Sequence, residues 1–214
     1  TKESEAKRLE YAKHFWETRK RKGITLLDAE KWMRERNYFG LMMVNTGEAD
    51  ALVTGYSRSY PSTIKPVIQL IDKAPGVSKI ATTNMMMTAR GPIFLSDTAI
   101  NPNPSADDLA RIALMTAKTV KMFGMEPVIA MVSYSNFGSS HNEGPSKVSQ
   151  AVAYLHENFP DLIVDGEIQT DFALNPEMLK SKFPFSKLVN KKVNTLIFPN
   201  LDAANITYKL LKEL

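Results

Sequence analysis

An unbroken apolar run that ends in a loop rich in serine and glycine constrains this fold more than any other feature. The run is Pro127–Val132, and the loop Ser133–His141 (SYSNFGSSH) follows it. A helix is predicted to begin near Gly144 and Pro145. Such a strand, loop and helix bring backbone N–H groups, hydroxyls and the positive end of the helix together. The pattern therefore indicates an anion-binding loop, although a polar turn whose hydroxyls satisfy one another fits the residues equally well.

Other strand-like segments lie along the second half of the chain. Lys79–Met86 and Pro92–Ile100 are so close together that we expect an antiparallel hairpin. Helix-like stretches separate the segments Val128–Ser133, Leu162–Asp165 and Thr195–Phe198. Alternation of strands and helices favours an α/β fold with mostly parallel strands. Ligands of such sheets bind beyond the carboxyl ends of the strands, where we expect the polar loops to meet.

The first part of the chain is predicted to be mostly helical. Helices are expected over residues 4–22, from Thr25 in a capping-box-like start, and over residues 62–72. A buried strand is predicted over Ala49–Thr54. A break at Pro75 and Gly76 indicates a domain boundary.

Composition excludes several classes of protein. The absence of cysteine rules out a disulfide framework, a thiolate metal site and a cysteine nucleophile, and it fits a cytoplasmic protein. No apolar stretch approaches the roughly 20 residues of a membrane span, so we expect no membrane partner. The net charge is +4, but the basic run Arg19–Lys22 fits the end of a helix better than a nucleic-acid contact.

Chemical motifs narrow the function further. No Gly-x-Ser-x-Gly elbow supports a serine nucleophile, and no dinucleotide fingerprint or P-loop is present. Asp165, Glu167 and Asp171 could hold a divalent cation, but acceptance of hydrogen bonds at strand ends is the favoured interpretation. We therefore assign no metal ligand.

Four segments together resemble the phosphate acetyl/butyryltransferase family, over nearly the whole chain. They are 49–55 (ADALVTG), 135–139 (SNFGS), 165–171 (DGEIQTD) and 198–209 (FPNLDAANITYK). Finer features resemble one branch, the C-terminal domain of large bacterial NADP-dependent malic enzymes. These features are 34–40 (RERNYFG), 58–61 (RSYP) and the pair Asn136 and Phe137, where transacetylases usually have Ser-Thr-Lys-Gly-Ser.

The resemblance implies an α/β, two-lobed fold of the phosphate acetyltransferase type, similar to isocitrate and isopropylmalate dehydrogenases. Mostly parallel sheets would be flanked by helices. Residues 1–76 and 198–214 would form the first lobe, incomplete because the family's C-terminal tail is absent. Residues 77–197 would form the second, dimerising lobe. The family's acyl-transfer residues follow the last helix, so we assign no catalytic residue.

The resemblance also implies a function. We expect a regulatory and oligomerising domain of an NADP-dependent malic enzyme, which converts malate to pyruvate by oxidative decarboxylation, with acetyl-CoA as allosteric effector. The alternatives are an active phosphate acetyltransferase and an oligomerisation scaffold without a ligand. No cofactor is expected in this segment, whereas the parent enzyme would use NADP and Mg²⁺ or Mn²⁺. Expected partners are acetyl-CoA, further copies of the chain and an upstream malic-enzyme catalytic domain in the same polypeptide.

Loop chemistry and resemblance together predict a site for acetyl-CoA or phosphate. Its expected residues are Arg58, Ser62, Thr63, Lys65 and Asn205 in the first lobe, and Ser135, Asn136, Gly138, Ser139, Ser140, Gln169 and Asp171 in the second. Lys65 stands where the family often has arginine. It keeps the charge but loses the bidentate geometry of a guanidinium.

Overall fold

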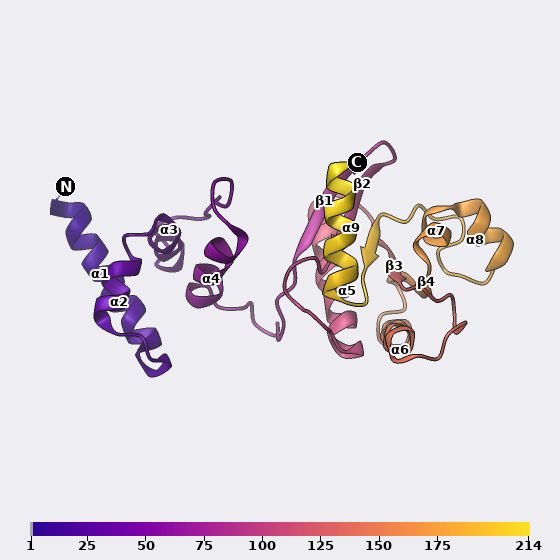
Figure 1. Cartoon of the computed structure of the whole chain (residues 1–214), viewed down its shortest axis with the longest axis horizontal. Helices are drawn as coiled ribbons and strands as arrows, with labels where there is room; N and C mark the ends of the chain where they lie inside the picture. The colour runs from indigo at the N-terminus through magenta and orange to yellow at the C-terminus, as the bar shows by residue number, and fades with distance from the viewer. Residues whose placement is uncertain (1) are drawn as a thin grey trace. The chain divides into compact units, whose positions relative to one another are not determined.

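The computed structural model describes residues 2–214, with side chains from residue 4 onward. The chain divides into two compact units between Val77 and Ser78, one residue beyond the predicted break (Figure 1). In the described residues, no helix is long and apolar enough to cross a membrane. The two units have separate cores, and each is described by itself.

The first unit is helical throughout its described secondary structure. Its elements are α1 (Lys2–Arg19), the short 3-10 helix η1 (Lys20–Lys22), α2 (Leu26–Trp32), α3 (Arg36–Asn45) and α4 (Tyr60–Leu70). The apolar faces of these α-helices meet in one core, in which Tyr11, Phe15 and Met42 are at most 1% exposed. The predicted capping box at Thr25 is confirmed, because its hydroxyl accepts from the Asp28 amide at 3.1 Å.

The predicted strand over Ala49–Thr54 is wrong. These residues form no strand, Val53 is 97% exposed, and only Leu52 packs against the core. A strand needs a neighbour to pair with its N–H and C=O groups, and the described part of this unit has no other strand. Gly40 accommodates Leu52, since a Cβ atom there would lie 2.9 Å from the leucine Cδ1.

The second unit contains a five-stranded sheet. Its strands are β1 (Thr83–Thr88), β2 (Gly91–Ser96), β3 (Val128–Val132), β4 (Ile163–Ile168) and β5 (Thr195–Ile197). They lie in the order β1-β2-β5-β3-β4; β1 and β2 are antiparallel, and the other pairs are parallel. The predicted hairpin and the mostly parallel sheet are confirmed.

Helices cover both faces of this sheet. The helices are α5 (Ala106–Met122), α6 (Glu143–Asn158), α7 (Thr170–Leu174), α8 (Pro176–Lys182) and α9 (Leu201–Glu213). Ile129 and Met131 of β3 pack with α5 and α6, whereas Val128, Ala130 and Val132 pack with α7, α8 and α9. This alternation is the two-residue period of a strand that is buried on both faces.

Helix α9 belongs to the second unit, although residues 198–214 were expected to complete the first lobe. The reason is its packing. Ala204 is fully buried in the core that includes Leu95 of β2, and Asn205 Nδ2 donates to the Thr98 carbonyl at 3.0 Å. The arrangement of the two lobes stays a prediction.

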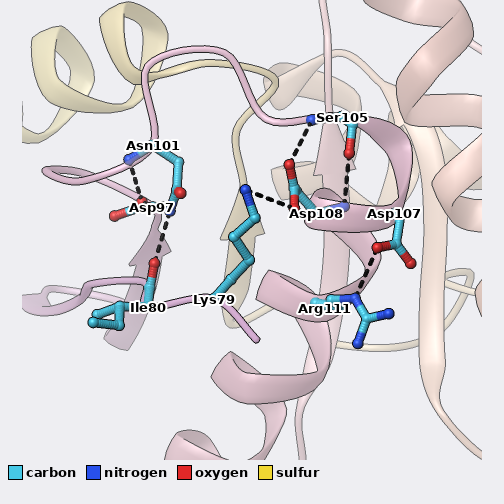
Figure 2. A network of polar contacts seen from close by, with 8 residues as sticks. All are labelled: Lys79, Ile80, Asp97, Asn101, Ser105, Asp107, Asp108 and Arg111. Carbon is cyan, nitrogen blue, oxygen red and sulfur yellow. Dashed lines mark hydrogen bonds and ion pairs between the residues drawn. The ribbon is translucent and has the colours of Figure 1, made fainter. Parts of the chain in front are cut away.

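A buried carboxylate ties the end of β2 to the segment that precedes β1. Asp97 is 4% exposed and accepts from the amides of Asn101 at 2.8 Å, Thr82 at 3.0 Å and Ala99 at 3.2 Å. Burial raises the pKa of Asp97, but hydrogen bonds, led by those from Thr82, outweigh burial and hold this pKa below its ordinary value. Figure 2 shows that Asn101 also reaches the carbonyl of Ile80, with Nδ2 at 2.9 Å.

The same region anchors the start of α5. Lys79 lies 3.3 Å from the Asp108 carboxylate, and Asp108 forms a capping box with Ser105 (Figure 2). The segment that enters the unit is therefore fastened to both the sheet and α5.

Candidate anion-binding sites

Three of the predicted first-lobe residues share one cavity. It has a volume of about 280 Å³ and is lined by Trp32, Glu35, Asn37, Tyr38, Arg58, Ser62, Lys65 and Pro66. Thr63 does not line it, because its hydroxyl donates to the Ser59 carbonyl at 3.2 Å in the first turn of α4.

Cations and aromatic rings meet in this cavity. Lys65 Nζ lies 5.6 Å from the centre of the Trp32 ring, and that ring stacks on Tyr38 with centroids 5.5 Å apart. Arg58 Nη1 lies 3.4 Å from the Glu35 carboxylate. A site with two cations beside aromatic faces suits a ligand that carries both phosphate and a planar ring.

The serine-rich loop of the second unit is held together by its own hydrogen bonds. Ser135 Oγ, in a side chain only 1% exposed, lies 3.0 Å from Ser139 Oγ and 3.1 Å from Glu167 Oε1. It also accepts from the Ser140 amide at 3.0 Å, and Ser139 Oγ accepts from the Asn136 amide at 3.0 Å. These contacts fit the interpretation as a satisfied polar turn, and ligand binding by these hydroxyls stays a prediction.

The carboxyl end of β4 positions this loop. Glu167 Oε1 accepts from the Gly138 amide at 2.5 Å, while Gln169 donates from its amide to Asn136 Oδ1 at 2.8 Å and from Nε2 to the Tyr134 carbonyl at 2.7 Å. Sequence reasoning placed Glu167 among general hydrogen-bond acceptors and missed its contact with Gly138. The loop is thus preorganised by the neighbouring strand.

Gly138 and Ser140 also line a cavity of about 310 Å³ beside α6, together with His141 and Glu167. Glu167 is 1% exposed, and its Oε2 has no hydrogen-bond partner in the described structure. This atom is itself buried, so the cavity gives it no direct contact with solvent.

The acidic residues of the 165–171 segment do not converge. Asp165 lies within β4 rather than past its end, and accepts from Ser186 Oγ and the Lys187 amide at 2.8 Å each. Asp171 is exposed in the first turn of α7. Among the described residues, no group of three or more His, Cys, Asp or Glu side chains could hold a metal ion.

A cavity of about 200 Å³ lies at the carboxyl ends of β3 and β5. Its lining residues are Asn103, Ser133, Tyr134, Glu143, Gly144, Pro145, Lys147, Pro199 and Asn200. Helices α6 and α9 leave these neighbouring strands on opposite faces of the sheet. Ligands of open α/β sheets bind at such a switch point.

Lys147 is the cation of this cavity, and sequence reasoning missed it. Its Nζ donates to Asn103 Oδ1 at 2.5 Å, and burial lowers the pKa of its ammonium group against an opposing effect of Glu143. The first residues of α6 and the Asn200 cap of α9 line the same cavity. A lysine beside helix N-termini attracts an anion. The sequence signal that could have found Lys147 is its position in the first turns of the helix predicted to begin near Pro145.

Comparison with known proteins agrees with this architecture. A family model described as phosphate acetyl/butaryl transferase matches residues 1–214. Two solved phosphotransacetylases share the fold: that of Streptococcus pyogenes has a TM-score of 0.85 and 39% identity, and that of Staphylococcus aureus has 0.80 and 37%. In both cases the match covers 95% of this chain and 62% of the other. The expected α/β fold, with a mostly parallel sheet between helices, is confirmed.

Relatives with curated functions are similar over the same range. The phosphate acetyltransferase of Acetivibrio thermocellus is 39% identical over 212 residues, which cover 96% of this chain but 64% of that protein. The NADP-dependent malic enzyme of Haemophilus influenzae is 38% identical over 201 residues, which cover 94% of this chain and 26% of that protein. Phosphate acetyltransferases outnumber malic enzymes among these relatives. The chain belongs to the phosphate acetyl/butyryltransferase family.

Proposed function

We propose that this chain is the substrate-binding part of a phosphate acyltransferase, which moves an acyl group between phosphate and CoA. The observation that carries the proposal is the cavity at the carboxyl ends of β3 and β5, here called the switch-point cavity. Lys147 and the N-terminus of α6 line it together. Family membership and the names of most relatives support acyl phosphate as the anion. The cytoplasm, where acyl phosphates and CoA occur together, is the proposed location.

Each cavity takes a different part of the chemistry. During transfer, the CoA sulfur bonds to the acyl carbon, the bond from that carbon to the phosphate oxygen breaks, and the proton of the thiol ends on the phosphate that leaves. Lys147 neutralises the phosphate that departs, because a fixed cation stabilises charge where it develops. Arg58 and Lys65 attract the phosphates of CoA, and Trp32 and Tyr38 supply aromatic surface beside these cations. No residue of this chain is assigned to proton transfer.

Thioester formation from acetyl phosphate and CoA, measured with the full polypeptide that carries this chain, tests this proposal. Replacement of Lys147 with Gln should lower kcat/KM for acetyl phosphate at least tenfold and leave the KM for CoA unchanged, whereas Lys65→Glu should raise the KM for CoA. Lys118→Gln, an exposed lysine on α5, is the matched control. Equal loss in Lys147→Gln and Lys118→Gln would argue against an anion site at the switch point.

A second candidate is the regulatory domain of an NADP-dependent malic enzyme, in which acetyl-CoA acts as effector. One observation favours it. Phe137, where the family's loop usually has lysine, packs its ring at 5.0 Å from the rings of Phe183 and Phe185. An aromatic anchor therefore replaces a charge in the loop. NADP and Mg²⁺ or Mn²⁺ would bind elsewhere in the polypeptide, in a malic-enzyme catalytic domain.

The two candidate functions differ in the reactions that the protein would catalyse. A malic enzyme oxidises malate with NADP, is inhibited by acetyl-CoA and forms no thioester from acetyl phosphate. Phe137→Lys provides a further distinction. If Phe137 has replaced a lysine that binds substrate, the Phe137→Lys variant should form thioester faster than the parent. An unchanged rate of thioester formation in a folded variant argues against this replacement.

We also propose that the second unit self-associates. Edge strand β1 carries the exposed side chains Met85 and Met87, at 42% and 74%, and contains no charged residue. Uncharged, exposed edge strands are ready to pair with another chain. Sedimentation of a Met85→Lys, Met87→Lys double variant should give monomer where the parent gives dimer. A parent that stays monomeric at micromolar concentration contradicts this assignment.

A further inference from the structure

A second cavity in the first unit is surrounded by guanidinium groups. It has a volume of about 320 Å³ and is lined by Ser4, Arg8, Met33, Arg34, Arg36, Phe39 and Gly40. None of these residues lines the cavity that holds Arg58 and Lys65. The motif Arg34–Gly40, which stood out in the sequence, thus forms most of one wall.

The charges of this cavity are poorly neutralised by its own unit. Arg8 is paired with Glu5 along α1. In the part of the chain that the structure describes, neither Arg34 nor Arg36 has an ion-pair partner. Glu35 lies between them in sequence, but its carboxylate faces Arg58, 3.4 Å away, in the other cavity. Two guanidiniums therefore remain available to an anion.

Helix α3 adds to the positive potential. It is ten residues long, begins at Arg36, and its N-cap residue Glu35 makes no capping hydrogen bond with its side chain. Its first amide groups and the positive end of its dipole are thus left for another acceptor. Met33 and Phe39 supply an apolar surface beside these donors.

We propose that this cavity binds a ligand with a phosphate or pyrophosphate group. Arg34 and Arg36 hold the phosphate oxygens with their guanidinium forks, since this planar geometry matches phosphate in bidentate contacts. The volume lies at the lower end of the range of small-molecule pockets, so it admits a pyrophosphate or the phosphates of a nucleotide. The site is separate from the proposed acyltransferase cavities and does not depend on that function.

Calorimetric titration of the whole chain with pyrophosphate tests the site, with sodium sulfate at the same ionic strength as reference. The Arg34→Gln, Arg36→Gln double variant should bind pyrophosphate at least tenfold more weakly than the parent. Arg36→Lys should fall between the two, because lysine keeps the charge and loses the fork. Arg21→Gln, an exposed arginine of the same unit, is the matched control and should bind as the parent does.

Titration with ADP distinguishes a nucleotide from inorganic pyrophosphate as the ligand of this cavity. Tighter binding of ADP than of pyrophosphate, weakened by the same double variant, supports a nucleotide; the reverse order supports inorganic pyrophosphate. Pyrophosphate binding that is lost in Lys65→Glu but kept in the double variant belongs to the other cavity and overturns the proposal. Pyrophosphate that binds no better than sulfate overturns it as well.

Discussion

The two units of this protein bury apolar side chains in different ways. The second unit sandwiches its sheet between two helical layers, so both faces of β3 are buried. The first unit relies on one cluster of helices around Tyr11 and Phe15. Its segment from Ala49 to Tyr60 crosses the surface largely exposed. An apolar run becomes a strand in the second unit because neighbouring strands pair with it, whereas a comparable run in the first unit has no strand to pair with.

This difference predicts that the units respond to mutation independently. Trp16 and Trp32, the two tryptophans of the chain, both lie in the first unit. Tryptophan fluorescence therefore follows the unfolding of the first unit, and circular dichroism follows both. A substitution confined to one unit should move one transition and leave the other in place.

The largest effect is expected from Phe15→Ala. This fully buried ring touches Trp32 and Tyr38, with centroids 5.9 Å and 5.8 Å away. Truncation should cost the first unit about 3–5 kcal/mol through lost contacts and the cavity left behind. Denaturant titration should show an early fluorescence transition and an unchanged second component in circular dichroism. A shift of both would mean that the units unfold together.

Asp97→Ala should destabilise the second unit by about 3 kcal/mol. Hydrogen bonds to a charged group contribute about 1.5–3 kcal/mol each, and the loss of several is partly offset by relaxation of the loop. The fluorescence transition should not move. Asp107→Ala is a suitable control, because that exposed carboxylate pairs with exposed Arg111 in the same region and should matter little (Figure 2).

Lowering the pH should reproduce part of the destabilisation expected from Asp97→Ala. The pKa of Asp97 is lower in the folded protein than in the unfolded chain, so its contribution is fully present above about pH 3.9, the ordinary value for aspartate. It is lost as the pH falls through the lower, folded value. The second-unit transition should therefore weaken below about pH 4, and Asp97→Asn should remove that part of the pH dependence. The same slope in both proteins would assign it to other carboxylates.

Removal of one helix N-cap in each unit is expected to have the smallest effect on stability. Thr25 caps α2 in the first unit and Ser105 caps α5 in the second, each in a box with an aspartate three residues on. Replacement of either by alanine should cost about 1 kcal/mol. Thr25→Ala should move the fluorescence transition alone, and Ser105→Ala should leave it in place. The opposite pattern would contradict the division at Val77.

Local rules made much of this fold predictable from sequence. The cap at Thr25 depends on residues within one turn, and the hairpin of β1 and β2 on a short connection. Strand formation at Ala49–Thr54 could not be judged in this way, because it requires a partner strand elsewhere in the chain. The assignment of α9 failed for a related reason, since it depends on which surface Ala204 covers.

The candidate sites were predictable in part. Arg58, Ser62 and Lys65 come from one short segment, so their convergence on one cavity follows from the helix that begins at Tyr60. Lys147 and Asn103 meet only because α6 begins at the edge of the sheet where the loop before α5 lies, a relation that no local pattern encodes.

The methionines on β1 give the protein a sensitivity to oxidants that its lack of cysteine would not suggest. Met85 and Met87 present their thioethers to solvent along an edge strand. Oxidation to the sulfoxide converts a flexible apolar side chain into a polar one, and methionine sulfoxide reductases reverse the change. Any assembly built on this edge should loosen under peroxide and recover on reduction. Buried Met131 of β3 should stay protected until the second unit unfolds.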